Sequence, residues 1–167
     1  MNPLSRLLED RLPAIDAGVM SHGFAAHGRD YVFVLENAFG PEPGTYRLTF
    51  THVVELNHTT SVTDDVWQRS WSDPFTDYKA WEDAGEPDGY VFGTNWSLAY
   101  PGFEAVNDDP VASTWSARLD RSMYKATIGT DRFEIGLVFH DVRLEQVNDH
   151  APTVSQVFVP LPPAVSS

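Results

Sequence analysis

The sequence contains no cysteine among its 167 residues. This absence excludes a disulfide scaffold, a zinc site with thiolate ligands, an iron–sulfur cluster and a cysteine nucleophile. A chain of this length buries about 70% of the surface that its unfolded form exposes, so it forms a core without such crosslinks.

Basic residues are also scarce, because 11 Lys and Arg stand against 24 Asp and Glu, for a formal net charge of −13. A strongly acidic protein is repelled by phosphate backbones. We therefore expect no direct binding to nucleic acid.

Long apolar runs are missing as well. The longest covers residues 31–35, far short of the roughly 20 residues that a membrane span needs. The first eleven residues mix charges and show no apolar core followed by a small-residue cleavage site, a pattern that predicts no signal peptide. We expect a cytoplasmic protein without membrane association.

Strand patterns are present in the first half of the chain. Residues 31–35 are apolar on both faces, which predicts a central strand with a helix covering one face. Tyr46, Leu48 and Phe50 alternate with polar residues, as in a half-buried strand. The phase of this alternation flips at His52, which indicates a β-bulge.

The last third carries the clearest structural signal. Residues 124–128 and 133–139 alternate on either side of a turn at 129–131, which predicts a hairpin. The phase shifts again at His140, after which Val142 is expected to point inward.

Helical patterns separate these strands. Asn2 and Pro3 suit the start of a helix whose leucines recur at helical spacing as far as Ile15, with a kink or break at Pro13. Short helices are expected to begin near Asp64, Asp73 and Asp109.

The combined pattern predicts an α+β fold with a mainly antiparallel sheet, an N-terminal helix and short helices inserted between strands. Residues 1–150 are expected to form a single domain, and residues 151–167 an extended, proline-rich tail.

Acidic residues and tryptophans concentrate in one stretch. Between Asp64 and Asp109 there are eleven acidic and two basic residues, a net charge of −9. An acidic surface with large rigid aromatic side chains suits the docking of a basic protein. The alternative is that the acids only solvate an exposed region while the tryptophans fill the core. The candidate partner-binding residues are Asp64, Asp65, Trp67, Trp71, Asp73, Asp77, Trp81, Glu82, Asp83 and Glu86.

Several short segments, taken in order from residue 20 to 147, resemble the YxiG-like proteins of Gram-positive bacteria. They are His22-Gly23-Phe24, Arg29-Asp30-Tyr31, Trp67-Gln68-Arg69-Ser70, Phe75-Thr76-Asp77-Tyr78, Asp88-Gly89-Tyr90-Val91-Phe92-Gly93, Tyr100-Pro101-Gly102 and Leu137-Val138-Phe139-His140-Asp141-Val142-Arg143. The resemblance implies no catalytic residues. Some members occur in loci with large secreted toxins, which implies an immunity or toxin-neutralising role.

Six histidines raise the question of a metal site. His22 and His27 are five residues apart, and His52 and His58 are six apart, so neither pair shares one helical face. His52 and His140 both fall at phase switches, where they are able to converge, but polar residues at bulges more often satisfy local hydrogen bonds. We expect no metal and no cofactor.

Catalytic signatures are absent from the sequence, which has no Gly-x-Ser-x-Gly elbow and no phosphate-binding glycine loop. A His–Asp dyad between His22 and the His140-Asp141 pair is a weaker catalytic alternative. The leading hypothesis is a non-enzymatic binding protein that neutralises a basic toxin or nuclease. Two alternatives stay open: a structural homodimer, and a small-ligand-binding protein or enzyme with a pocket at His52, Trp96, Tyr100 and His140.

Overall fold

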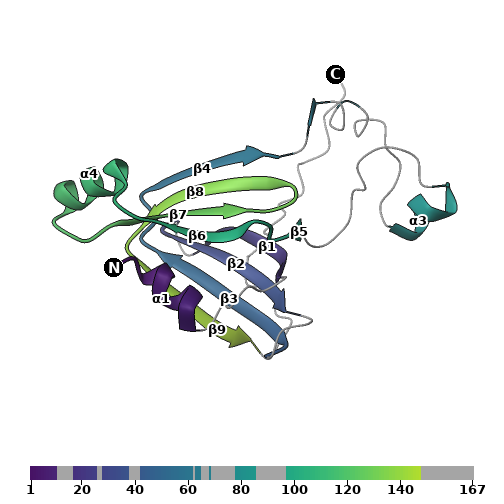
Figure 1. The fold of residues 1–167 in the computed structure, drawn as a ribbon, viewed down its shortest axis with the longest axis horizontal. Helices are drawn as coiled ribbons and strands as arrows, with labels where there is room; N and C mark the ends of the chain where they lie inside the picture. Colours follow the sequence, from purple (N-terminus) through teal and green to yellow (C-terminus); the bar gives the residue numbers. More distant parts are fainter. Residues whose placement is uncertain are drawn as a thin grey trace, which may run out of the picture.

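The computed structural model describes residues 1–10, 17–25, 28–37, 42–61, 63–64, 68, 78–85 and 97–147. Within these residues, nine strands form two antiparallel sheets, with the orders β5-β1-β2-β3-β9 and β4-β8-β7-β6 (Figure 1). The strands are β1 (Ala17–Ala25), β2 (Asp30–Asn37), β3 (Gly44–Thr51), β4 (Glu55–Thr60), β5 (Ser97–Leu98), β6 (Gly102–Val106), β7 (Tyr124–Gly129), β8 (Phe133–Phe139) and β9 (Asp141–Val147). The helices are α1 (Pro3–Asp10), α3 (Tyr78–Asp83) and α4 (Pro110–Leu119). The predicted α+β fold is confirmed, and the predicted tail lies outside the described residues.

Two bent strands pass from one sheet into the other. The chain leaves β3 and enters β4 after His52, whose φ is 51°. It leaves β8 and enters β9 through His140, whose backbone N–H donates to the carbonyl oxygen of Thr51 at 3.0 Å. Because β3 pairs with β9 and β4 pairs with β8, these segments form one continuous bent ladder. Both phase shifts that the sequence showed are thus the corners between the sheets.

The core lies between the sheets and is rich in aromatic rings. Phe50 of β3 meets Phe139 of β8 edge to face, with ring centroids 4.9 Å apart. Phe33 of β2 meets Phe103 of β6 in the same geometry at 5.6 Å. These rings join β3 to β8 and β2 to β6, so the two sheets hold each other through this layer.

The second sheet, rather than a helix, covers the inner face of β2. The sequence predicted a helical cover because residues 31–35 are apolar on both faces, but a facing sheet satisfies the same pattern. Tyr31, Phe33 and Leu35 belong to the cluster that includes the inner residues of β7 and β8. On this face the cover is therefore a sheet and not a helix.

Helix α1 contacts β6 and β9, the outermost strands at one side of the two sheets. Asn2 caps it, since its Oδ1 accepts from the backbone N–H of Leu4 at 3.0 Å while its Nδ2 donates to the carbonyl oxygen of Lys125 at 2.8 Å. Leu4 is fully buried in the core cluster. The helix thus covers the gap between these two strands, at one side of the two sheets.

None of the helices in the described ranges has the length and apolar character of a membrane span.

Helix α4 begins where the sequence predicted, directly after Asp109. Asp109 caps it by accepting from the backbone N–H groups of Val111 and Ala112 at 2.9 and 3.0 Å, and it also pairs with Lys125 at 2.9 Å. Burial acts to raise the pKa of Asp109, but the Lys125 ammonium and the two N–H groups outweigh it and lower the pKa. The helix ends at Asp120, which adopts a left-handed conformation with φ 50°.

Replacing Asp109 with alanine is expected to lower the free energy of unfolding by about 1 kcal/mol, because two N–H groups lose their acceptor. Asp109→Asn keeps a capping oxygen and loses the charge that faces Lys125, so it should cost less. Urea denaturation of both variants checks this. Equal losses for the two substitutions would show that the ion pair, and not the cap, carries the effect.

Candidate functional site

The acidic segment predicted to bind a partner is described in part. Asp64, Glu82 and Asp83 are exposed, and the last two lie on α3 together with the backbone of Trp81. Lys79 pairs with Asp83 across one helical turn at 2.8 Å. Helix α3 ends before Gly85, whose N–H donates to the carbonyl oxygen of Glu82 at 2.9 Å. The remaining candidates, Asp65, Trp67, Trp71, Asp73, Asp77 and Glu86, lie outside the described residues.

The acidic stretch from Asp64 to Asp109 does not form one surface. Its last described members are Glu104 on β6 and Asp108 and Asp109 at the start of α4. In Figure 1, α3 and α4 lie on opposite sides of the two sheets. The candidate surface is therefore limited to the part between Asp64 and Glu86, and we call it the acidic segment.

Two of the four residues proposed for a ligand pocket meet at the corner between the sheets. The rings of His52 and His140 lie edge to face with centroids 5.9 Å apart. His140 donates through Nδ1 to the carbonyl oxygen of Ser122 at 2.8 Å, and the backbone N–H of His52 donates to Asp30 at 3.0 Å. Each histidine thus helps to fix the corner.

The other two pocket candidates are not part of this pair. Trp96 lies outside the described residues. Tyr100 is 74% exposed, directly after β5. Leu98, two residues before it, accepts through its carbonyl oxygen from the backbone N–H of Asp131. Asp131 lies just before β8, whereas His140 lies just after it. The structure therefore separates Tyr100 from the two histidines by the length of β8.

A second group of rings, which the sequence did not reveal, lies where β1 faces β4. His22 of β1 stacks on His58 of β4, with ring centroids 5.8 Å apart. Both rings pack on Phe133 of β8, at 4.5 and 5.3 Å. Nδ1 of His22 shares a hydrogen bond of 2.7 Å with the hydroxyl of Tyr31. We call His22, Tyr31, His58 and Phe133 the ring cluster.

The ring cluster contains the two largest pKa shifts in the described part of the chain. Burial, followed by the charge of His58, lowers the pKa of His22 to about 4. Burial raises the pKa of Tyr31 to about 12. Both side chains are therefore neutral between pH 5 and pH 10, and their hydrogen bond persists over that range.

The sequence signal for this cluster was weak because its members come from four strands. The histidine pairs that are close in sequence do not meet; instead, His22 meets His58 and His52 meets His140. His22 likewise faces Tyr31 rather than the His140-Asp141 pair. Among the described residues, no three His, Asp or Glu side chains are arranged to hold a metal ion.

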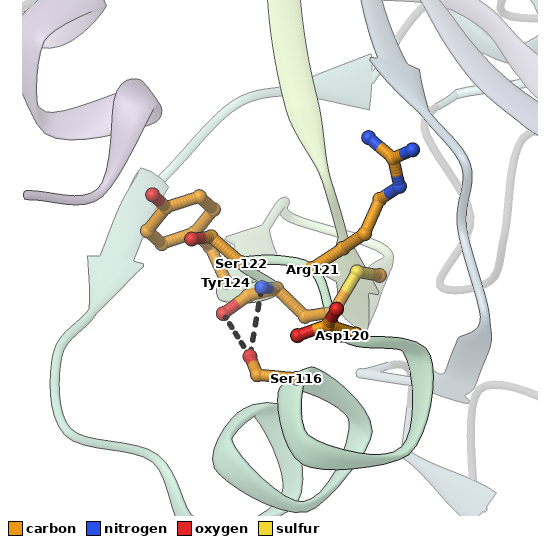
Figure 2. A pocket seen from close by; sticks show the side chains of 6 residues that line it. Ser116, Asp120, Arg121, Ser122 and Tyr124 are labelled. Atoms are coloured by element: carbon orange, nitrogen blue, oxygen red, sulfur yellow. Dashed lines mark hydrogen bonds between the residues drawn. The ribbon is translucent and has the colours of Figure 1, made fainter.

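Two open cavities lie beside α4, with volumes of about 450 and 480 Å³. In the first, Ser116 accepts through Oγ from the backbone N–H of Met123 at 2.8 Å, and the guanidinium of Arg121 points away from it (Figure 2). In the second, Asp109 and Lys125 bind each other. The polar groups that line the two cavities thus hold α4 on the sheet, and they do not converge on a point where a ligand would bind.

The family model for YxiG-like protein matches residues 1–156. No curated protein matches the chain.

Proposed function

The chain belongs to the YxiG-like family, and from this premise we propose that it is a non-enzymatic, cytoplasmic binding protein of the immunity type. Its partner would be a basic protein such as a toxin or nuclease, which it neutralises by covering a positive surface. The acidic segment is the docking surface in this proposal.

The observation that carries the proposal is the exposure of carboxylates in a stretch of strongly negative charge. Asp64, Glu82 and Asp83 are all exposed. Complementary fields of this kind steer a basic partner and raise its rate of association. An immunity protein benefits from fast capture, because an unbound toxin acts on its target.

The Lys79–Asp83 pair does not block this use of α3. Their side chains are 80% and 65% exposed, and an exposed pair at this spacing contributes only about 0.3–0.5 kcal/mol. A partner with an arginine is therefore able to replace Lys79 as the counter-ion of Asp83 at small cost.

Reversing three charges tests the proposal. In the variant Asp64→Lys, Glu82→Lys, Asp83→Lys, we expect association with a basic partner to slow at least tenfold at low salt, and the difference to shrink at high salt. The partner is obtained by affinity capture from the native host, including products of neighbouring genes, and association is measured by surface plasmon resonance.

A matched control reverses three exposed acids elsewhere, Glu9, Asp10 and Glu36. It changes the net charge by the same amount, so it isolates the position of the charge from its total. If the two triple variants slow association equally, or if the captured protein is not basic, the acidic segment is not the docking surface.

Within the residues that the structure describes, the small-ligand alternative has less support from the geometry. It requires polar groups that converge in a concave site, whereas the two cavities beside α4 engage theirs in structural contacts. The homodimer alternative is disfavoured by a net charge of −13 on each copy. Light scattering on the purified protein distinguishes it directly.

A further inference from the structure

Each crossover between the two sheets carries a histidine, and the fold brings these two histidines together. His52 lies between β3 and β4, and His140 lies between β8 and β9. They are 88 positions apart in the sequence, yet their rings lie edge to face with centroids 5.9 Å apart. The pairing of β3 with β9 and of β4 with β8 places the two crossovers side by side. The histidine pair therefore exists only in the folded chain.

The hydrogen bond of His140 determines which of its ring nitrogens is available. Nδ1 lies 2.8 Å from the carbonyl oxygen of Ser122. Because a carbonyl oxygen only accepts, Nδ1 carries the proton of the neutral ring and Nε2 keeps its lone pair. Within the described residues, Nε2 makes no hydrogen bond. Metal-binding histidines commonly show this arrangement, in which the second nitrogen donates to a backbone carbonyl.

His52 contributes an accessible ring on a fixed backbone. The residue is exposed, and its backbone N–H donates to Oδ1 of Asp30 at 3.0 Å. Arg29 binds both oxygens of the same carboxylate, at 2.9 and 2.8 Å, so Asp30 holds the backbone of His52 and is not itself available as a ligand. In the part of the chain that the structure describes, the ring of His52 makes no hydrogen bond. The ring is thus able to turn toward His140.

The separation of the two rings is close to that of a shared metal ion. Two imidazoles that bind one tetrahedral ion have ring centres about 5 Å apart, since each nitrogen lies about 2 Å from the metal. The rings of His52 and His140 are 5.9 Å apart and inclined by 83°. A rotation of the exposed His52 side chain covers the difference, and water fills the remaining positions, as in other sites that keep open positions.

The second histidine pair of the fold has a geometry that does not suit an ion. The rings of His22 and His58 are stacked, with an interplanar angle of 21°. The lone pairs of an imidazole lie in the plane of its ring, so two stacked rings do not direct them to one point. Nδ1 of His22 is also engaged with the hydroxyl of Tyr31 at 2.7 Å. This pair therefore serves as a control for the first.

The chemistry of the ligands indicates the class of ion. Imidazole nitrogen suits Zn²⁺, Cu²⁺ and Ni²⁺, whereas Mg²⁺ and Ca²⁺ prefer oxygen ligands. A net charge of −13 attracts cations to the surface of the protein. Among the described residues, no third His, Asp or Glu side chain completes a group of three around a metal ion. The affinity should therefore be that of a two-ligand site and not that of a closed structural site.

We propose that His52 and His140 form a two-histidine site for a zinc ion at the corner between the sheets. The ion ties the crossover from β3 to β4 to the crossover from β8 to β9. Because the unfolded chain lacks this pair, zinc binding stabilises the folded state. The inference is independent of the proposed function, since His52 precedes β4 and the acidic segment follows it.

The test uses the full chain, without a histidine tag, and Zn²⁺ alone as the probe. Isothermal titration calorimetry should detect binding of one Zn²⁺ per chain. At about a hundredfold excess of Zn²⁺ over the dissociation constant, the melting temperature should rise by about 5 °C. Mg²⁺ should cause neither effect, because it does not favour imidazole ligands.

Asparagine replaces each ligand with little disturbance of the corner. His52→Asn keeps a residue type that tolerates the φ of 51° at this position. In His140→Asn, the side-chain amide nitrogen takes the place of Nδ1 and still donates to Ser122. Each variant should weaken Zn²⁺ binding about tenfold or more and lose most of the rise in melting temperature. The control His58→Asn removes an exposed histidine outside the site and should bind Zn²⁺ as the unchanged protein does.

A nitrogen-15 NMR titration of the histidine side chains gives a readout that does not depend on a variant. Nε2 of His140 and one ring nitrogen of His52 should shift together as Zn²⁺ is added, while the ring nitrogens of His22 should not. Absence of Zn²⁺ binding, or equal losses in His58→Asn and in the two corner variants, would overturn the proposal. Shifts confined to histidines outside the corner would overturn it in favour of adventitious binding.

Discussion

Replacing Leu4 with alanine is expected to lower the free energy of unfolding by about 2–5 kcal/mol, the range for deleting a fully buried leucine side chain. Leu4 has 0% of its surface exposed and belongs to the main core cluster. Its helix, α1, packs against both β6 and β9, so the substitution also weakens the contact by which α1 joins these two strands. Urea denaturation followed by circular dichroism measures the change.

Leu119→Ala is the control for this prediction. Leu119 ends α4 and is 45% exposed, and substitutions at such surface positions usually change stability by less than about 0.5 kcal/mol. Similar losses at the two positions would mean that α1 does not seal the sheets as the structure indicates.

Acidification from pH 7 to pH 4 is expected to destabilise the fold through His22. The pKa of His22 is about 4 in the folded protein, below the ordinary value of 6.5, so between these values the unfolded state binds more protons. Stability conferred by the neutral ring is complete above pH 6.5 and falls as the pH drops toward 4. The expected loss in the free energy of unfolding is about 2 kcal/mol. It is smaller than the value that corresponds to the whole pKa difference, because His22 is partly exposed to solvent.

The variant His22→Phe isolates this contribution. Carboxylates with a lowered pKa, such as Asp109 and Asp30, also lose their stabilising contribution when acid protonates them. This loss is the same in the unchanged protein and in the variant. The difference in unfolding free energy between the two proteins should therefore change by about 2 kcal/mol between pH 6.5 and pH 4. An NMR titration that places His22 near 6.5 would contradict the explanation.

The strands with regular alternation were predictable from the sequence because each faces the core on one side and solvent on the other. Tyr46, Leu48 and Phe50 are all buried, as their spacing indicated. The hairpin of β7 and β8 is confirmed for the same reason. The two phase shifts were visible as well, although only the structure shows that they mark the same corner.

Two strands were not predicted, and both have local causes. β1 has glycines at 18 and 23, and its ladder is interrupted by a bulge between Val19 and Ser21, which breaks the alternation. β6 has only five residues and directly follows Pro101, a residue type that is unfavourable inside a strand. In both cases pairing with a neighbouring strand, rather than local preference, decides the conformation.

The candidate site was less predictable than the fold. The acidic character of the segment that follows β4 was evident from charge alone, but the ring cluster depends on which strands face each other. His22 and His58 are 36 positions apart in the sequence and have no motif in common. Sheet topology brings them together, and topology was the least determined part of the sequence-based prediction.

The continuous bent ladder has a consequence for how the protein is made. Its pairs, such as Thr51 with Asp141, join segments about ninety positions apart, and contacts of such separation slow folding because a large loop must close first. During synthesis β3 and β4 emerge long before β8 and β9, and they wait without their partners. The nascent chain therefore leaves the apolar side chains of β3 without their full cover until its last third has left the ribosome, and that interval is when it most depends on chaperones.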